Sequence, residues 1–141
     1  MSTNKILIGG LIGFVVTFIL GFLIYGMLLT DFFATNAGSA TGVSRAEDAM
    51  LFLPLALGHL ALGMLLAIIL GRWAGIKTFT SGAMAGAVIG FLTGSAYDLI
   101  MYGTTNMMNL TGTLVDIVIT TISTAIAAGI IGWYYGYSNK N

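Results

Sequence analysis

The sequence predicts an all-α membrane protein with four transmembrane helices, and composition and periodicity are the observations that predict it. Of the 141 residues, 57% are hydrophobic and only 7% are charged, whereas a soluble domain carries roughly 25% charged residues. Four apolar stretches alternate with short polar segments. Each stretch is long enough to cross a bilayer at about 1.5 Å per helical residue.

The spans are expected over residues 6–29, 50–70, 81–103 and 110–135, with an outer loop over residues 30–44, in a single domain of residues 1–141. The first span exceeds the apolar region of a typical secretory signal, which is about 7–15 residues long. Ser44 and Glu47 match a capping box, which predicts that the second helix begins at Arg45. Pro54 predicts a kink near the start of the second span.

The basic residues predict the orientation of the chain. Four spans place both termini on one side of the membrane. That side carries Lys5, Arg72, Lys77 and Lys140, and the opposite side carries Arg45 alone. Because cytoplasmic loops are enriched in Lys and Arg, both termini are predicted to be cytoplasmic, in a bacterial inner membrane.

An internal similarity suggests that the chain contains two repeats. Residues 9–14 (GGLIGF) align with residues 86–91 (GAVIGF), and Tyr25-Gly26 then aligns with Tyr102-Gly103. We therefore expect two parallel helical-hairpin repeats, related by an axis along the membrane normal. Coincidence within a glycine-rich composition is the alternative explanation.

Small residues recur at every fourth position of each span. In the third span the row consists of Gly82, Gly86, Gly90 and Gly94, and it ends in Asp98 and Tyr102. Residues at i and i+4 share one helix face, and small residues let transmembrane helices approach closely. This glycine-zipper pattern predicts helix packing at Gly9, Gly13, Gly21, Gly63, Gly82, Gly86, Gly90, Gly94 and Gly132. Since four such rows exceed what one small bundle needs, we expect a homo-oligomer with span 1 or span 3 at the subunit contact.

Three ionisable side chains lie within the apolar spans: His59, Asp98 and Asp116. All three fall on the small-residue rows and in the predicted outer half of the membrane. A charge deep in a membrane costs at least about 2.5 kcal/mol, so such groups face inward and find partners. Either they pin helix register through hydrogen bonds, or they converge with Tyr25 and Tyr102 on an outward-facing pocket that binds a cation or relays protons.

The remaining residues argue against several other classes of site. One His and two Asp form a conceivable ligand set for a divalent ion, but no spacing supports it. Methionines near the outer end would suit Cu(I), although methionine more often fills gaps in packing; they are Met27, Met50, Met101, Met107 and Met108. We therefore predict no metal and no cofactor.

Several activities are also not expected. The chain has no cysteine, which excludes disulfides, thiol catalysis and Cys-ligated metals. No motif pairs a nucleophile with a base, so an enzyme is not expected. The formal net charge is zero and no basic patch occurs, so we expect no nucleic-acid partner.

A loose resemblance covers nearly the whole chain. It rests on Leu23-Ile24-Tyr25-Gly26, on residues 29–33 and on residues 82–103. In these segments the chain resembles small four-helix bacterial integral membrane proteins grouped as domains of unknown function, so the resemblance implies no activity. The chain differs from small multidrug transporters of similar size, because its first span contains no Glu.

Two functions are consistent with these observations. The first is an oligomeric membrane interaction or scaffold protein, with the lipid bilayer, further copies of itself and an unknown membrane protein as partners. The alternative is a small channel or transporter with an outward-facing cation or proton site.

Overall fold

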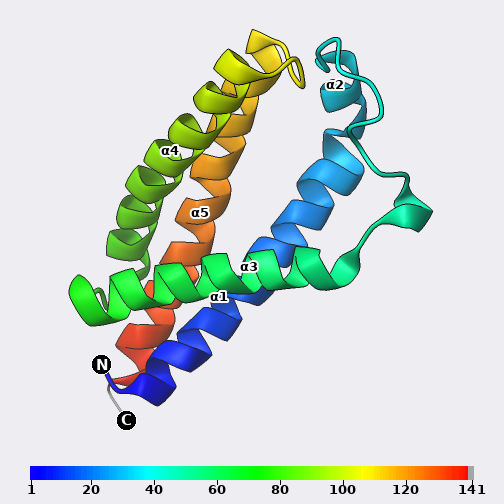
Figure 1. Ribbon diagram of the computed structural model, residues 1–141. Coiled ribbons are helices and arrows are strands. Elements are labelled where there is room, and N and C mark those ends of the chain that lie inside the picture. Colours follow the sequence, from blue (N-terminus) through cyan, green and yellow to red (C-terminus); the bar gives the residue numbers. More distant parts are fainter. Residues whose placement is uncertain (140–141) are drawn as a thin grey trace.

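The computed structural model describes residues 1–139, except for the side chain of Glu47. Four helical segments dominate it (Figure 1). They are α1 (Thr3–Leu23) with its π-helical extension η1 (Ile24–Leu28), α3 (Phe52–Ile68) with its π-helical extension η3 (Ile69–Trp73), α4 (Phe79–Thr104) and α5 (Leu110–Ser138). Each segment is long and apolar enough to cross a membrane, which confirms the predicted all-helical class with four helices that could span a membrane.

Polar side chains cap the start of three of these helices. Ser2, Thr78 and Asn109 precede α1, α4 and α5 in extended backbone conformations. Their side-chain oxygens accept from the backbone N–H of Lys5, Ser81 and Gly112, respectively. These bonds satisfy amide groups that have no partner inside the helix.

The predicted start of the second membrane helix was wrong, because α3 begins at Phe52 and not at Arg45. Pro54 is the third residue of α3, a position whose N–H needs no intrahelical acceptor, so the proline starts a helix here instead of kinking one. Only a 3₁₀ turn, η2 (Glu47–Ala49), forms where the capping box was expected. The Glu47 side chain itself lies outside the described residues.

The segment expected as an outer loop is helical in its first part. Thr30–Thr35 form the short helix α2. The chain then runs beside the α4–α5 connection, where Gly38 N donates to Met107 O at 2.9 Å and Asn109 N donates to Asn36 O at 3.0 Å. We call residues 36–40 and 106–109 the loop strap. It joins two parts of the chain that are far apart in sequence.

The helices pack as two hairpins, α1 with α3 and α4 with α5, and α1 also contacts α5. The glycine row of the third span lies against α5. The buried residues of α4 are Gly82, Gly86, Gly90, Gly94 and Asp98. A Cβ on Gly90 would lie 2.8 Å from Thr120 O and from Thr124 Cβ, so the two backbones are too close for a side chain there.

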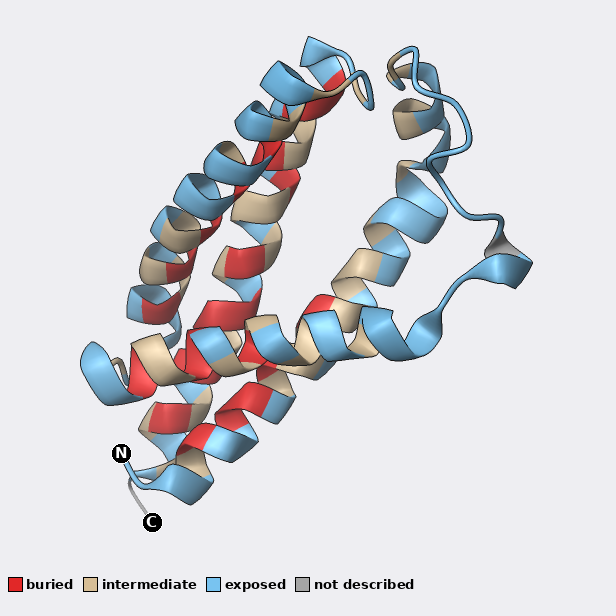
Figure 2. Ribbon diagram, in the orientation of Figure 1, coloured by how far each residue is buried: buried red, intermediate tan, exposed pale blue. Residues whose placement is uncertain are grey.

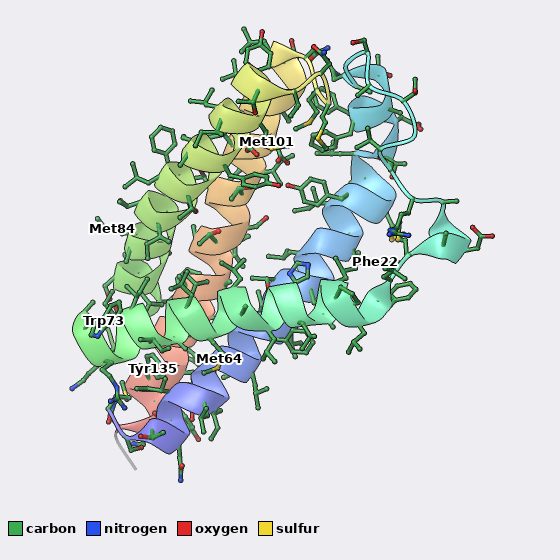
Figure 3. The ribbon with its side chains drawn as sticks, viewed as in Figure 1. Phe22, Met64, Trp73, Met84, Met101 and Tyr135 are labelled. Carbon is green, nitrogen blue, oxygen red and sulfur yellow. The ribbon has the colours of Figure 1, made fainter. Side chains whose placement is uncertain are left out.

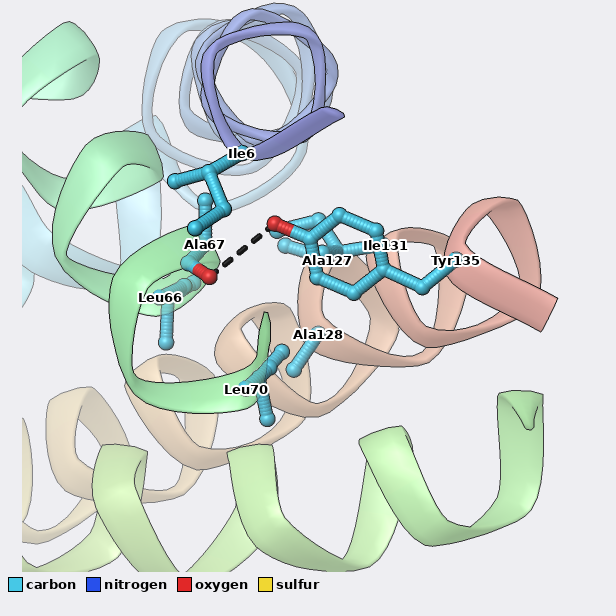
Figure 4. Close-up of a cluster of buried hydrophobic side chains, with 8 residues drawn as sticks. All are labelled: Ile6, Leu66, Ala67, Leu70, Ala127, Ala128, Ile131 and Tyr135. Atoms are coloured by element: carbon cyan, nitrogen blue, oxygen red, sulfur yellow. Dashed lines mark hydrogen bonds between the residues drawn. The ribbon is translucent and has the colours of Figure 1, made fainter. Parts of the chain in front are cut away.

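A hydrophobic core joins α1, α3 and α5 near the chain termini (Figures 2 and 4). Its buried members are Ile6, Leu66, Ala67, Leu70, Ala127, Ala128, Ile131 and Tyr135. Tyr135 is fully buried, and its hydroxyl donates to Ala67 O at 2.9 Å. The one polar group of the ring is therefore satisfied inside an apolar cluster.

The start of α1 and the end of α5 lie at the same end of the molecule (Figure 1), which we call the terminal end. There Lys5 Nζ donates to Ser138 O, and Arg72 Nη2 donates to Thr3 Oγ1 at 3.4 Å. The backbone of Lys77 contacts Gly136 at the same end, whereas Lys140 lies outside the described residues. Trp73, 73% exposed, points away from the bundle there (Figure 3).

The opposite end, which holds α2 and the loop strap, we call the loop end. Toward it, the two hairpins diverge, and the first half of α3 extends away from α4 and α5 (Figure 1). Phe52 and Leu53 on that half are 61% and 71% exposed. The buried core therefore lies at the terminal end, and polar contacts join the hairpins at the loop end.

Candidate cation or proton site

Asp98 is the most deeply buried ionisable side chain of the site. It ends the glycine row of α4, six residues before the last residue of that helix, and only 5% of its surface is exposed. Its Oδ2 atom is buried and has no hydrogen-bond partner among the described residues. The row that brings α4 close to α5 thus also carries a carboxyl group into their interface.

Asp116 lies on the facing helix, α5, and connects the site to α1. Tyr25 Oη donates to Asp116 Oδ1 at 2.5 Å, and the carboxyl groups of Asp98 and Asp116 are close enough to interact electrostatically. A 2.5 Å O–H···O distance is at the short end of the range for charge-assisted hydrogen bonds. The site is therefore built from one side chain of each of three helical segments.

Local structure positions the Tyr25 ring. Tyr25 belongs to η1, in which Leu29 N donates to Ile24 O five residues earlier at 2.8 Å. Thr30 Oγ1 donates to the carbonyl of Tyr25 at 3.1 Å, and the ring of Phe33 on α2 lies 5.3 Å from the Tyr25 ring, centre to centre. Single π-helical turns are frequent at functional sites, and this one aims the phenol at α5.

A cavity of about 90 Å³ opens beside the two carboxyl groups, at the loop end of the α4–α5 hairpin, where Figure 3 labels Met101. Its lining residues are Tyr97, Asp98, Met101, Tyr102, Thr105, Met107, Met108, Thr113 and Asp116. This volume accommodates one to a few water molecules, since a water occupies about 30 Å³ in the liquid. The cavity is thus sized for a small ion or a proton with water, not for an organic substrate.

The cavity is lined by acidic side chains but by no basic side chain among the described residues. Of the nine lining residues, all of which are described, two are acidic and none is basic. The hydroxyls of Thr105 and Thr113 donate to carbonyls of their own chain segment, Met101 O at 2.8 Å and Asn109 O at 3.0 Å. Tyr25 is therefore the only hydrogen-bond donor to either carboxyl group in the described part of the chain.

His59 does not join the two aspartates at this cavity. It lies between α3 and α1, where its ring meets Phe18 edge-on at 5.5 Å between centres. A Cβ on Gly21 would lie 3.1 Å from the imidazole, and the buried Nδ1 atom has no partner among the described residues. Gly21 is one turn before Tyr25 in α1, so the His59 side chain packs against α1 one turn away from Tyr25.

Tyr102 does line the cavity, and it is 43% exposed. The site also contains residues that sequence reasoning did not select. Thr113, only 1% exposed, and Tyr97 line the cavity, but isolated Thr and Tyr residues carry no distinctive signal in an apolar span. Three of the nine lining side chains are Met101, Met107 and Met108, methionines for which the sequence suggested Cu(I) binding or, more commonly, gap filling.

The nine glycines predicted to pack helices contact other parts of the same chain. Gly9 lies against the Tyr135 ring, Gly13 and Gly63 lie against each other, and Gly21 lies against His59. Gly132 faces the Thr78 carbonyl. The row of α4, comprising Gly82, Gly86, Gly90 and Gly94, faces α5. All nine glycines therefore pack against segments of the same chain.

The donor set is poorly suited to a divalent metal. Among the described residues there is no group of three or more His, Cys, Asp or Glu side chains that could hold a metal ion. Calcium takes six to eight oxygen ligands, and magnesium requires a near-octahedral shell. Two carboxyl groups in a small cavity are a better match to a proton or to a monovalent cation with its water.

Comparison of the chain with protein-family models, curated proteins and solved structures found no match.

Proposed function

We propose that the protein is a small membrane transporter or channel that takes a cation or a proton at Asp98 and Asp116 from the loop end. One observation carries the proposal: an almost fully buried carboxyl group with a free oxygen faces a second carboxyl group, and no lining residue, all of them described, is basic. Two adjacent negative charges, one of them almost fully buried, are strongly unfavourable without a positive partner. A bound cation or proton removes that cost.

The position of the site supports access from one side. The cavity lies at the loop end, whereas the buried core around Tyr135 closes the contact between the hairpins at the terminal end. With the termini in the cytoplasm, as the basic residues predict, the cavity faces the exterior of a bacterial inner membrane. Transport across the bilayer then requires the core at the terminal end to open.

Ion flux into proteoliposomes tests this function. The full-length protein is reconstituted, and uptake of H⁺, Na⁺ and K⁺ is measured for the wild type, Asp98→Asn and Asp116→Asn. Each substitution keeps the size of the side chain and removes its charge, so the flux should fall more than tenfold. Asp31→Asn is the matched control, because Asp31 is exposed on α2 and is not a cavity residue; its flux should equal that of the wild type.

Two results would contradict the proposal. One is wild-type flux no higher than that of protein-free liposomes, for all three ions. The other is flux that survives both substitutions unchanged while circular dichroism shows folded protein.

A second candidate function is that of an oligomeric membrane interaction or scaffold protein. The observation in its favour is the first half of α3, which is exposed on several sides and carries Gly58, a glycine where an added Cβ would meet no atom within 4 Å. Small residues favour close contacts between transmembrane helices. Gly58→Leu should then reduce the oligomer mass measured in detergent, whereas Leu57→Ile should not, and a wild-type monomer would exclude this candidate.

A further inference from the structure

We infer that the ligand of this site is a proton, that Asp98 binds and releases it, and that Tyr25 holds Asp116 as its neighbouring acceptor. This inference rests on the proposed function, because it names the ligand of the same site. It goes further in assigning different roles to two aspartates that the sequence does not distinguish.

Asp116 is the carboxyl group of the pair that accepts a hydrogen bond from a neighbouring side chain. The phenol of Tyr25 donates to its Oδ1 at 2.5 Å, a short O–H···O contact. The donor comes from the other hairpin, so its direction is set by η1 and by the packing of Phe33 on the ring. One oxygen of Asp116 is therefore committed to accepting a hydrogen bond.

Asp98 has the geometry of the group that changes its protonation. It is 5% exposed, and its Oδ2 has no partner in the described residues, yet it lines a cavity at the loop end. Two adjacent carboxyl groups repel each other when both are ionised, and a single proton removes the repulsion. Asp98 is the better buried of the two, lines the cavity and has one oxygen without a partner among the described residues, so it is the one placed to carry that proton.

The other titratable groups near the pair do not replace the proton. From α4 they are the phenols of Tyr97 and Tyr102, and from η1 the phenol of Tyr25. None of these is a cation at neutral pH. His59 on α3 packs against Gly21 and Phe18 and does not line the cavity. Within the described residues, no side chain supplies a positive charge to the two carboxyl groups.

Metal ions fit the cavity less well than a proton does. The described residues hold no cluster of the usual hard or borderline metal ligands, and the two threonine hydroxyls of the lining already donate to backbone carbonyls. Soft monovalent ions are the strongest competitors, because Met101, Met107 and Met108 bring thioether sulfurs to the lining. Silver is therefore included in the test as the probe for that alternative.

The proton step is balanced without any further reactant. A hydronium ion from the aqueous phase at the loop end transfers its proton to the Asp98 carboxylate, which yields a neutral carboxylic acid and one water molecule. Release is the reverse reaction. The charge of the carboxyl pair changes by one unit in each direction, while the Tyr25 hydroxyl keeps its proton.

Infrared difference spectroscopy on the full-length protein in lipid tests this assignment. The carboxylic-acid C=O band is recorded while the pH is changed around neutrality. The wild type should show a band from a protonated buried carboxyl group, Asp98→Asn should lose it, and Asp31→Asn should retain it. A wild type that lacks the band, or a band that Asp116→Asn abolishes and Asp98→Asn leaves intact, would overturn the assignment.

Ion additions separate the proton from the competing ligands. Na⁺, K⁺ and Mg²⁺ at millimolar concentration should leave the band unchanged, and Ag⁺ should not bind with one-to-one stoichiometry at this cavity. Loss of the band on stoichiometric Ag⁺ binding, together with loss of that binding in Met101→Leu, would assign the cavity to a soft cation instead.

Failure of this inference is distinguishable from failure of the proposed function. A wild-type protein that shows the Asp98 band but no ion flux retains the proton site and loses the transport function. Conversely, Na⁺ or K⁺ flux that depends on Asp98, without any carboxylic-acid band, retains transport and excludes the proton as the ligand.

Discussion

At the scale of single residues, the α4–α5 contact depends on the absence of side chains. The row of glycines is the buried face of α4, and at Gly82, Gly86 and Gly90 backbone atoms of α5 occupy the space that a Cβ atom would need. In lipid the hydrophobic effect does not drive helices together, so such close packing is a main source of attraction. A single added methyl group should therefore have a measurable effect.

Gly90→Ala is expected to destabilise the protein by about 1–3 kcal/mol, the usual cost of overpacking a well-packed contact. Its Cβ would lie 2.8 Å from Thr120 O and from Thr124 Cβ, and the α5 backbone cannot move aside without separating the helices. The measurement is the free energy of unfolding in a mixed detergent titration.

Gly58→Ala provides the control for that experiment. Gly58 is also helical, but a Cβ there would meet nothing within 4 Å, so the substitution should be neutral or stabilise the helix by up to about 1 kcal/mol. Equal free energies of unfolding for the two variants would show that α4 and α5 are not in close contact at Gly90.

The position of Asp98 could be read from the sequence, whereas the position of His59 relative to it could not. Asp98 continues a row at intervals of four residues, and that interval alone places it on the glycine face. His59 lies on a different helix, and whether it meets the aspartates depends on how α3 crosses α1. Spacing within one helix contains no information about that crossing. At the cavity the two aspartates meet without His59, so the alternative in which all three side chains converge is not seen there.

At the scale of the helices, a polar capping residue marks the starts of α1, α4 and α5, whereas no such residue marks the start of α3. Ser2, Thr78 and Asn109 supply side-chain acceptors where those helices begin. The start of α3 has no side-chain cap, and Leu51 occupies that position. The Ser-x-x-Glu match at Ser44 and Glu47 predicted a helix that begins at Arg45, but α3 begins at Phe52. A capping residue stabilises a helix only where the backbone that follows it is helical. No local sequence pattern predicted the two π-helical turns. One of them, η1, orients the Tyr25 side chain, and the other, η3, follows the end of α3.

Asn109→Ala should destabilise the protein more than Thr78→Ala does. Each residue caps a helix, a contribution of about 0.5–2 kcal/mol. Asn109 also donates from Nδ2 to Asn36 Oδ1 at 3.1 Å, so its loss removes a bond between the two segments of the loop strap, whereas the second side-chain bond of Thr78, to Ser81 Oγ at 2.6 Å, stays within the first turn of its own helix. Thermal unfolding followed by circular dichroism measures the difference, and a larger effect of Thr78→Ala would contradict it.

At the scale of the whole molecule, two helical hairpins are joined differently at their two ends. The terminal end has the apolar core around Tyr135, and the loop end has the Tyr25–Asp116 bond and the strap. Four membrane helices were predictable, because length and apolar composition suffice for that. The divergence of the hairpins and the pairing of the strap were not, since both depend on contacts between residues far apart in the chain.

A disulfide across the loop strap should block transport by locking the hairpins together. Ala37 and Met108 form an antiparallel bridge, and the flanking hydrogen bonds make it the closely spaced kind of pair, with Cα atoms about 4.5 Å apart, within disulfide range. The chain has no cysteine of its own. In Ala37→Cys/Met108→Cys, oxidation should reduce flux more than tenfold, and a reductant should restore it.

The single variants Ala37→Cys and Met108→Cys, treated with the same oxidant, control for local damage at the strap and at the cavity wall. If the oxidised double variant transports as fast as its reduced form, the hairpins do not need to separate at the loop end.

The uneven distribution of buried surface has a consequence for the surrounding lipid. Side chains such as Leu28 and Leu53 are 74% and 71% exposed toward the loop end, whereas Leu66 and Leu70 near the termini are fully enclosed. One leaflet must therefore solvate a broader, more irregular perimeter than the other. We therefore expect lateral pressure from the acyl chains around this perimeter to favour a smaller separation of the two hairpins.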